Sequence, residues 1–360
     1  FKNITIYAPN INYVACIAKN QNNSVQQVYM EEISITGKQF TSGLISYTYA
    51  GNFSDITAKR INVTGSSNYV SGIFGYIVKR EESRIQKIII ENSNIKGTGS
   101  YVGSVASYIE KEDTRAIWII EVESNNNEIS GLDYIGGIAG RSSYNRDAKI
   151  NKTHINGRSY VGGAFGYSDY LVQRAYVQES EILATGNYTG GICGTATGNG
   201  SFLNNMVENT TVISTGNYIG GLIGKNDRTF KENYVKNSII EGNLGVGALI
   251  GSNTFGISYS YAIGCQVNAN KNIGGVIGEH TRGGIIQTYN NSLIKGISNI
   301  GGVIGFLNNM EMSEANNTSG IYNNYAITKL EGENNIGGLI GDIAEDLVNP
   351  SKHYYNNYLQ

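Results

Sequence analysis

Apolar positions return along the chain in a glycine-rich pattern, of which "NYIGGLIG" at positions 217–224 is one copy. The copies align on the second glycine of the Gly-Gly pair, and this anchor position recurs every 26 to 36 residues. Self-similarity at such an interval is typical of solenoid repeats. A β-branched residue stands two positions before every anchor, which favours a strand there. The twelve anchors are Cys16, Gly43, Gly72, Ser104, Gly137, Gly163, Gly191, Gly221, Ala248, Gly275, Gly302 and Gly338, and the β-branched residues are Val14, Thr41, Val70, Val102, Ile135, Val161, Thr189, Ile219, Val246, Ile273, Ile300 and Ile336.

A second apolar run precedes each signature, as in "ENYVKNSIIEG" and "TYNNSLIKG". These runs alternate apolar and polar positions and usually end in glycine, which indicates a strand followed by a turn. Because helical periodicity is nowhere sustained, the pattern predicts an all-β fold, a parallel β-helix or β-solenoid of about twelve coils with a period of about 26–36 residues. We expect residues 1–360 to form a single repeat array that is cut within the repeat at both ends.

The repeated glycines have two expected structural roles. Glycine takes positive φ at little cost, so these positions are candidate sharp turns. In a parallel stack, like positions also lie over one another, and a glycine column leaves room for its neighbours. Valine at Gly221 should therefore destabilise the fold more than a substitution of Asn226, which we expect in the adjoining loop. The candidate turn glycines are Gly137, Gly163, Gly191, Gly221, Gly275, Gly302 and Gly338.

A column of aromatic residues stands three positions before the anchors and changes character along the chain. One interpretation is a surface stripe that binds a ligand or a partner laterally through ring faces. The other is an internal ladder, in which rings cover neighbouring glycines and asparagine amides bond coil to coil. The column runs Tyr13, Phe40, Tyr69, Tyr101, Tyr134, Tyr160, Tyr188, Tyr218, Gly245, Asn272, Asn299 and Asn335, and the candidate stripe is Tyr69 to Tyr218.

Composition favours strands over helices and argues against nucleic acid as a partner. The chain has 47 glycines, 26 tyrosines and 2 prolines, and glycine and asparagine are poor helix formers. Charged residues make up 16% with a net charge of −2, so no basic surface is predicted for nucleic acid. No apolar run is long enough to predict a membrane span. We expect Cys16, Cys193 and Cys265 to lie in separate coils as small core residues, too far apart for disulfides.

Candidate chemistry is sparse, and the sequence predicts no catalytic, cofactor-binding or metal-binding residues. The three histidines, His154, His280 and His353, form no "HExxH" zinc motif. We expect Glu279 and His280 to be a solvated polar pair in a loop. The acidic segments "EKED" at 110–113 and "DIAED" at 342–346 would be the places to look for polysaccharide cleavage, and we expect both to be solvated loops.

The copies "GGLIG", "GGVIG", "GGICG" and "GGIAG" resemble the GLUG repeat, named for Gly-Leu-hydrophobic-Gly. That repeat is found in large surface and secreted proteins, including adhesins and regions attached to immunoglobulin A-cleaving metallopeptidases. The resemblance covers nearly the whole chain and implies an architecture, without implying an activity. Early copies such as "YVACIAK" at 13–19 lack one or more of the glycines.

We therefore expect a non-enzymatic scaffold, extracellular or at the cell surface, that serves as an adhesin stalk or a surface-filament subunit. Its expected partners are further coils or domains of the same protein, another copy stacked end to end, or glycans or a host surface. The alternative is a carbohydrate-binding or carbohydrate-cleaving β-helix that uses the aromatic stripe.

Overall fold

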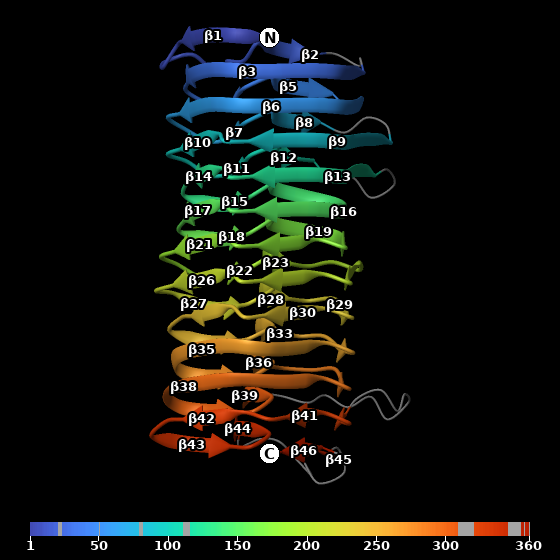
Figure 1. The fold of residues 1–360 in the computed structure, drawn as a ribbon, viewed down its shortest axis with the longest axis vertical. Coiled ribbons are helices and arrows are strands. Elements are labelled where there is room, and N and C mark those ends of the chain that lie inside the picture. Colours follow the sequence, from blue (N-terminus) through green and yellow to red (C-terminus); the bar gives the residue numbers. More distant parts are fainter. Residues whose placement is uncertain are drawn as a thin grey trace. The chain divides into compact units, whose positions relative to one another are not determined.

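A computed structural model describes residues 1–20, 24–49, 51–78, 82–110, 116–308, 320–344, 354–355 and 357–359. The predicted fold class is confirmed: in this part of the chain every regular element is a strand, the strand pairings that follow are parallel, and strands from successive repeats stack as a β-solenoid (Figure 1). No helix of the described residues is long and apolar enough to cross a bilayer.

The chain divides into two compact units, Phe1–Leu183 (unit 1) and Ala184–Gln360 (unit 2). The β-branched column is in register in each unit, with six members in unit 1 from Val14 to Val161 and six in unit 2 from Thr189 to Ile336. Each unit therefore stacks repeats as predicted, and the single continuous array stays a prediction.

The strands of unit 1 are β1 (Lys2–Tyr7), β2 (Ile17–Asn20), β3 (Val25–Gly37), β4 (Thr41–Ser42), β5 (Ile45–Tyr49), β6 (Asn52–Gly65), β7 (Val70–Ser71), β8 (Phe74–Val78), β9 (Ser83–Glu91), β10 (Asn94–Gly97), β11 (Val102–Gly103), β12 (Ala106–Ile109), β13 (Ile117–Asn125), β14 (Glu128–Ser130), β15 (Asp133–Gly136), β16 (Ala139–Asn151), β17 (His154–Gly157), β18 (Ser159–Gly162), β19 (Phe165–Gln173), β20 (Tyr176–Gln178) and, at the boundary, β21 (Glu181–Ala184).

The strands of unit 2 are β22 (Thr189–Gly190), β23 (Cys193–Ala196), β24 (Ser201–Leu203), β25 (Met206–Glu208), β26 (Thr211–Ser214), β27 (Asn217–Gly220), β28 (Ile223–Asn226), β29 (Thr229–Lys231), β30 (Tyr234–Lys236), β31 (Ile239–Glu241), β32 (Leu244–Gly247), β33 (Ile250–Asn253), β34 (Ile257–Ser258), β35 (Tyr261–Gly274), β36 (Ile277–His280), β37 (Ile285–Ile286), β38 (Tyr289–Gly301), β39 (Ile304–Leu307), β40 (Ile321–Tyr322), β41 (Tyr325–Ala326), β42 (Lys329–Glu331), β43 (Asn334–Gly337), β44 (Ile340–Ile343), β45 (Tyr354–Tyr355) and β46 (Tyr358–Leu359).

Three columns of residues with positive φ bend the chain, and they mark the corners of a repeat. The first corner is the aromatic column itself, where Tyr69 has φ 65° and Tyr134 has φ 58°. In unit 1 the second corner includes Asn92, and the third includes Lys87. Bulky residues seldom adopt this conformation, whereas glycine and asparagine do so readily. This preference explains why Gly245 and three asparagines occupy the same column as the tyrosines.

The chain does bend at the anchor glycines, since each of the seven candidates lies at a bend between two strands. Positive φ is not what requires glycine there, because none of them is among the residues with positive φ. Their second role, close stacking, is correct. A Cβ at Gly137 would collide with the carbonyl oxygen of Gly163, and a Cβ at Gly221 would collide with that of Ala248. The same collision occurs at Gly191, Gly275 and Gly302, and at Gly338 the neighbour is the Leu359 side chain.

Polar side chains satisfy the backbone where a corner interrupts the sheet. The Ser93 hydroxyl accepts a hydrogen bond from Ile61 N over 3.0 Å and donates to the carbonyl of Glu91 over 2.8 Å. In the next turn Asn127 Oδ1 accepts from Ser93 N over 2.8 Å. Each turn thus caps the backbone of the turn before it, which removes the cost of a buried unpaired amide.

Candidate functional site

The predicted stripe is a half-buried row of stacked rings in unit 1. We call it the first aromatic column, and there it consists of Tyr13, Phe40, Tyr69, Tyr101, Tyr134 and Tyr160. Ring centroids of Tyr101 and Tyr134 lie 4.7 Å apart with an interplanar angle of 9°, and those of Tyr134 and Tyr160 lie 4.5 Å apart at 6°. Because the rings face one another, their π faces are covered by their neighbours and their edges remain outside.

A second row packs against the first, and the sequence analysis missed it. This second aromatic column stands four residues after the anchors. Tyr76 and Tyr108 stack at 4.8 Å, and Tyr101 meets Tyr108 edge-on at 5.0 Å and 82°. An alignment of the position after the last glycine of each signature could have revealed it. Its members are Tyr47, Tyr76, Tyr108, Arg141 and Tyr167.

Burial among the rings disfavours the phenolate forms. It raises the pKa of Tyr134 to about 12, and it raises the pKa values of Tyr69, Tyr101 and Tyr108 as well. These hydroxyl groups are therefore protonated at neutral pH and are poor general bases. Two cations pack against these rings in the described part of unit 1. One is Lys19, whose Nζ lies 4.3 Å from the Tyr13 ring centroid, and the other is Arg141.

Arg141 occupies a tyrosine position in the second column, between Tyr108 and Tyr167. Its guanidinium lies 5.2 Å from the ring centroids of both Tyr108 and Tyr167, within cation–π range. Its Nη2 donates to Asp169 Oδ2 over 3.0 Å and its Nη1 to the Tyr108 hydroxyl over 3.1 Å. The Asp169 side chain is 6% exposed, so this carboxylate is the nearly buried counter-ion of a half-buried arginine.

Replacing Asp169 with asparagine should lower the free energy of unfolding by about 1–2 kcal/mol, because it leaves Arg141 without its counter-ion. The further change Arg141→Tyr, which restores the residue type of the column, should recover most of the loss. Urea denaturation of the two single variants and the double variant measures the coupling.

The exposed pair of Asp147 and Arg174, with Nε–Oδ1 at 2.6 Å, provides the matched control. Asp147→Asn should cost about 0.5 kcal/mol or less, since exposed ion pairs contribute little. Equal losses at Asp147 and Asp169 would contradict the role given to burial.

The stripe residues Tyr188 and Tyr218 lie in unit 2, with their rings stacked at 5.5 Å. At the next position Gly245 has φ 68°, and a Cβ there would lie 2.7 Å from the Tyr218 ring. The ring of Tyr218 thus covers a glycine, as the ladder interpretation expects. Burial, reinforced by the charge of Glu279, raises the pKa of Tyr218.

Asparagine amides continue the column beyond this glycine. Asn335 Nδ2 donates to Asn299 Oδ1 over 3.0 Å, and Asn299 Nδ2 donates to Asn272 Oδ1 over 2.8 Å. Asn272 Nδ2 then donates to Glu279 Oε1 over 2.6 Å. These polar groups serve contacts between turns, and a ligand for the tyrosine stripe stays a prediction.

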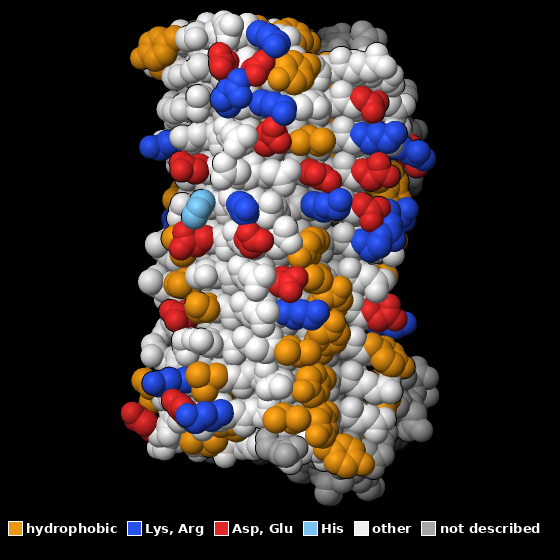
Figure 2. Space-filling view, viewed as in Figure 1, with side chains coloured by type: hydrophobic (Ala, Val, Ile, Leu, Met, Phe, Trp, Pro, Cys, Tyr) orange, Lys and Arg blue, Asp and Glu red, His pale blue; other side chains and the backbone are white. Residues whose placement is uncertain are grey.

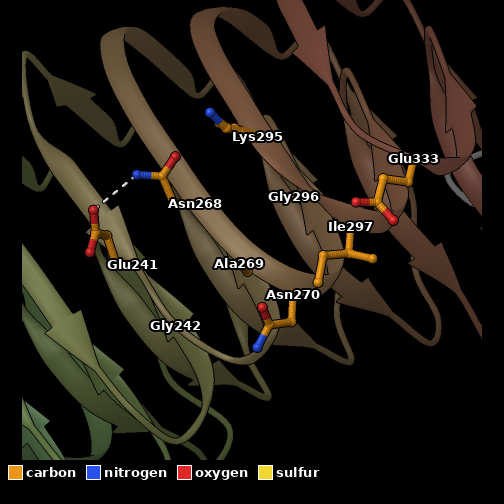
Figure 3. Close-up of a pocket in the computed structure, with 9 residues that line it drawn as sticks. All are labelled: Glu241, Gly242, Asn268, Ala269, Asn270, Lys295, Gly296, Ile297 and Glu333. Atoms are coloured by element: carbon orange, nitrogen blue, oxygen red, sulfur yellow. Dashed lines mark hydrogen bonds between the residues drawn. The ribbon is translucent and has the colours of Figure 1, made fainter.

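Unit 2 also carries an open groove of about 540 Å³ (Figure 3). Asn268 Nδ2 donates to Glu241 Oε1 over 2.9 Å on one side, and Lys295 Nζ lies 3.7 Å from Glu331 Oε2. The described lining includes no aromatic ring, so this groove offers no flat apolar face for stacking a sugar. The lining residues are Glu241, Gly242, Asn268, Ala269, Asn270, Lys295, Gly296, Ile297 and Glu333.

The remaining candidates for chemistry lie apart from one another. Glu279 points to the outer face, whereas His280 is fully buried. Both lie in strand β36, so the expected loop position is wrong for the pair, and the expected solvation is wrong for the histidine. His154 is exposed and its Nδ1 lies 3.0 Å from Glu181 Oε2. Positions 111–113, 345–346 and 353 of the acidic segments and the third histidine lie outside the described residues. Within the described ranges, no three His, Cys, Asp or Glu side chains gather as a metal site.

None of the three cysteines forms a disulfide within the described residues. Cys193 and Cys265 are buried, as expected for small core residues, and Cys16 is half-buried. Burial raises the pKa values of Cys16 and Cys265, which disfavours the reactive thiolate.

Comparison with known protein families, curated proteins and solved structures finds no match to this chain, so its resemblance to the GLUG repeat stays a prediction.

Proposed function

We propose that the chain is a non-enzymatic structural segment of an extracellular or cell-surface protein, a scaffold of the kind used as an adhesin stalk or a surface filament. The observation that carries this proposal is that the polar and aromatic columns are taken up by contacts between neighbouring turns. The rings of unit 1, the amides of unit 2 and the capping side chains at the corners contact the turns next to them. Stability that grows with the number of turns suits a spacer or a filament.

Ring geometry favours this scaffold over the carbohydrate-binding alternative. A sugar ring stacks on an exposed aromatic face, and the faces in the first aromatic column are covered by neighbouring rings at 4.5–5.2 Å. Further turns of the same protein, or a second copy stacked end to end, are the partners that this proposal implies. Glycans or a host surface would then be contacted by other parts of the assembly.

Antibodies raised against this chain test the location in intact and permeabilised cells of its source. We expect equal immunogold labelling of both preparations, with the gold lying outside the cell envelope, and no labelling by pre-immune serum. Labelling that appears only after permeabilisation would overturn the extracellular proposal.

Solution scattering over a range of concentrations tests end-to-end association, which should raise the apparent mass with concentration.

A further inference from the structure

An interior column of unit 2 carries hydrogen-bonding side chains where a solenoid core is usually apolar. Strands β28, β33 and β36 place Asn226, Asn253 and His280 in register, and Leu307 follows in β39. Asn226 Nδ2 donates to Asn253 Oδ1 over 2.8 Å, and Asn253 Nδ2 lies 3.0 Å from His280 Nδ1. All three side chains are fully buried. The predicted loop position of Asn226 is therefore wrong.

The hydrogen bonds of this column require a neutral imidazole. His280 Nε2 lies 2.9 Å from the carbonyl oxygen of Gly283 and donates to it, which leaves Nδ1 as the acceptor for the Asn253 amide. Asn253 cannot reverse its amide without loss, because its oxygen accepts from Asn226 and its nitrogen also donates to the carbonyl of Phe255. A second proton on the ring would point at an N–H donor.

Charged groups around the ring offer it no counter-ion. Glu279 is directed to Asn272 on the outer face, and Asp227 lies 3.4 Å from Lys225. Burial without a counter-ion lowers the pKa of His280 to about 4. In the described residues, the charged side chains on the strands packed against the ring and on the loops that follow them are Lys225, Asp227, Arg228, Glu279 and Arg282.

We propose that His280 is an acid-sensitive lock in unit 2. Its neutral ring joins the Asn253 amide to the Gly283 carbonyl, whereas a second proton, on Nδ1, faces the Asn253 N–H donor, so the charged ring leaves the buried column and the loop at Gly283 moves with it. The loop is bonded to the turn before it, since Thr281 N donates to Asn253 O and Arg282 Nε donates to Thr254 O. Gly283 also lines an open groove of about 420 Å³ together with Phe255. Release of the loop would reshape that groove.

The direction of the pH effect follows from the lowered pKa. The unfolded chain binds the proton near pH 6.5, whereas the folded chain binds it only near pH 4. Protonation therefore favours the unfolded state, and the stability is fully present above about pH 6.5 and is lost as the pH falls toward 4. Between pH 7.5 and 4.5 this group alone should reduce the folding equilibrium constant on the order of 100-fold.

The variant His280→Asn tests the lock, because asparagine occupies this column in the two preceding turns. The measurements are urea denaturation and hydrogen exchange of the amides at 281–284, each at pH 7.5 and 4.5, on wild type and variant. On going from pH 7.5 to 4.5, we expect the folding equilibrium constant of the wild type to fall on the order of 100-fold further than that of the variant. At pH 4.5 the amides at 281–284 should exchange faster in the wild type than in the variant. Other titrating groups cancel in this comparison.

His154→Asn is the matched control, because the same change is made at an exposed histidine, and it should leave the pH response of the wild type unchanged. A pH response in His280→Asn equal to that of the wild type would overturn the proposal. If this variant does not fold, NMR titration of the His280 ring in the wild-type protein decides. A pKa near 6.5 would overturn the lock, and a pKa near 4 with loop amides that open on protonation would support it.

Discussion

Valine in place of Gly221 is expected to lower the free energy of unfolding of unit 2 by about 4 kcal/mol, and it would prevent folding if the unit is less stable than that. The added side chain has no space, because its Cβ would collide with the carbonyl oxygen of Ala248 in the next turn and would lie 3.0 Å from the Val235 side chain. A backbone carbonyl cannot move aside without disturbing the hydrogen bonds between turns. Chemical denaturation followed by circular dichroism measures the loss.

Gly256 offers the same substitution at a site with space. A Cβ there would approach no atom closer than Gly284 O at 3.7 Å, and the residue is half-buried. Gly256→Val should therefore change the free energy of unfolding by less than about 1 kcal/mol. Comparable losses in the two valine variants would remove close stacking as the reason for the anchor glycines. Asn226, the control suggested by the sequence, is unsuitable because it is buried.

Sequence patterns predicted the strand columns because a parallel stack repeats its side-chain environment once per turn. A β-branched residue stands two positions before each anchor and pairs with a β-branched residue in the turn on either side. Ile219, for example, pairs with Thr189 and with Val246. The period and parallel register could therefore be derived from the spacing alone. Where the spacing between anchors lengthens, the extra residues do not disturb the pairing of these columns.

The corners could not be derived in the same way, because local propensity points to the wrong residues. Positive φ favours glycine, yet the corner is taken by Tyr134 and its equivalents, which are held there by rings stacked on both sides. A signal was present, since Gly245 and Asn272 share the tyrosine column and both types tolerate this conformation. An alignment could have revealed the column that contains Tyr108, but its edge-on packing against Tyr101 depends on the bend between them, which the sequence does not specify.

The two units differ in the side chains exposed on the face shown in Figure 2, and the composition of the whole chain does not show this difference. Charged side chains gather over unit 1 in Figure 2. Ion pairs between turns of this unit include that of Arg60 with Glu31. Over unit 2 the same view shows an apolar stripe, and the register there places Tyr234, Tyr261 and Tyr289 in one column. Whole-chain charge averages these two surfaces, so the difference could be found only repeat by repeat.

Leucine in place of Asn233 is expected to cost about 4 kcal/mol, although leucine suits the core by size and polarity. Asn233 Nδ2 donates to the carbonyls of Phe202 and Lys231, each over 2.9 Å, and its Oδ1 accepts from Asn205 N over 2.8 Å. Leucine would remove these partners from buried backbone groups at the corner formed by Glu232, which has φ 57°. Each such loss costs about 1–3 kcal/mol. Urea denaturation at pH 7.5 measures the change.

Serine at the same position separates lost hydrogen bonds from altered packing. Ser260 occupies this column in the next turn, where its hydroxyl accepts from Asn233 N over 3.1 Å and donates to Ser258 O over 2.8 Å. Asn233→Ser can make the equivalent bonds to Asn205 N and Lys231 O, so it should cost about 1–2 kcal/mol even though it leaves a smaller side chain in the core. If leucine proves less damaging than serine, core volume rather than capping of the corner determines stability at this position.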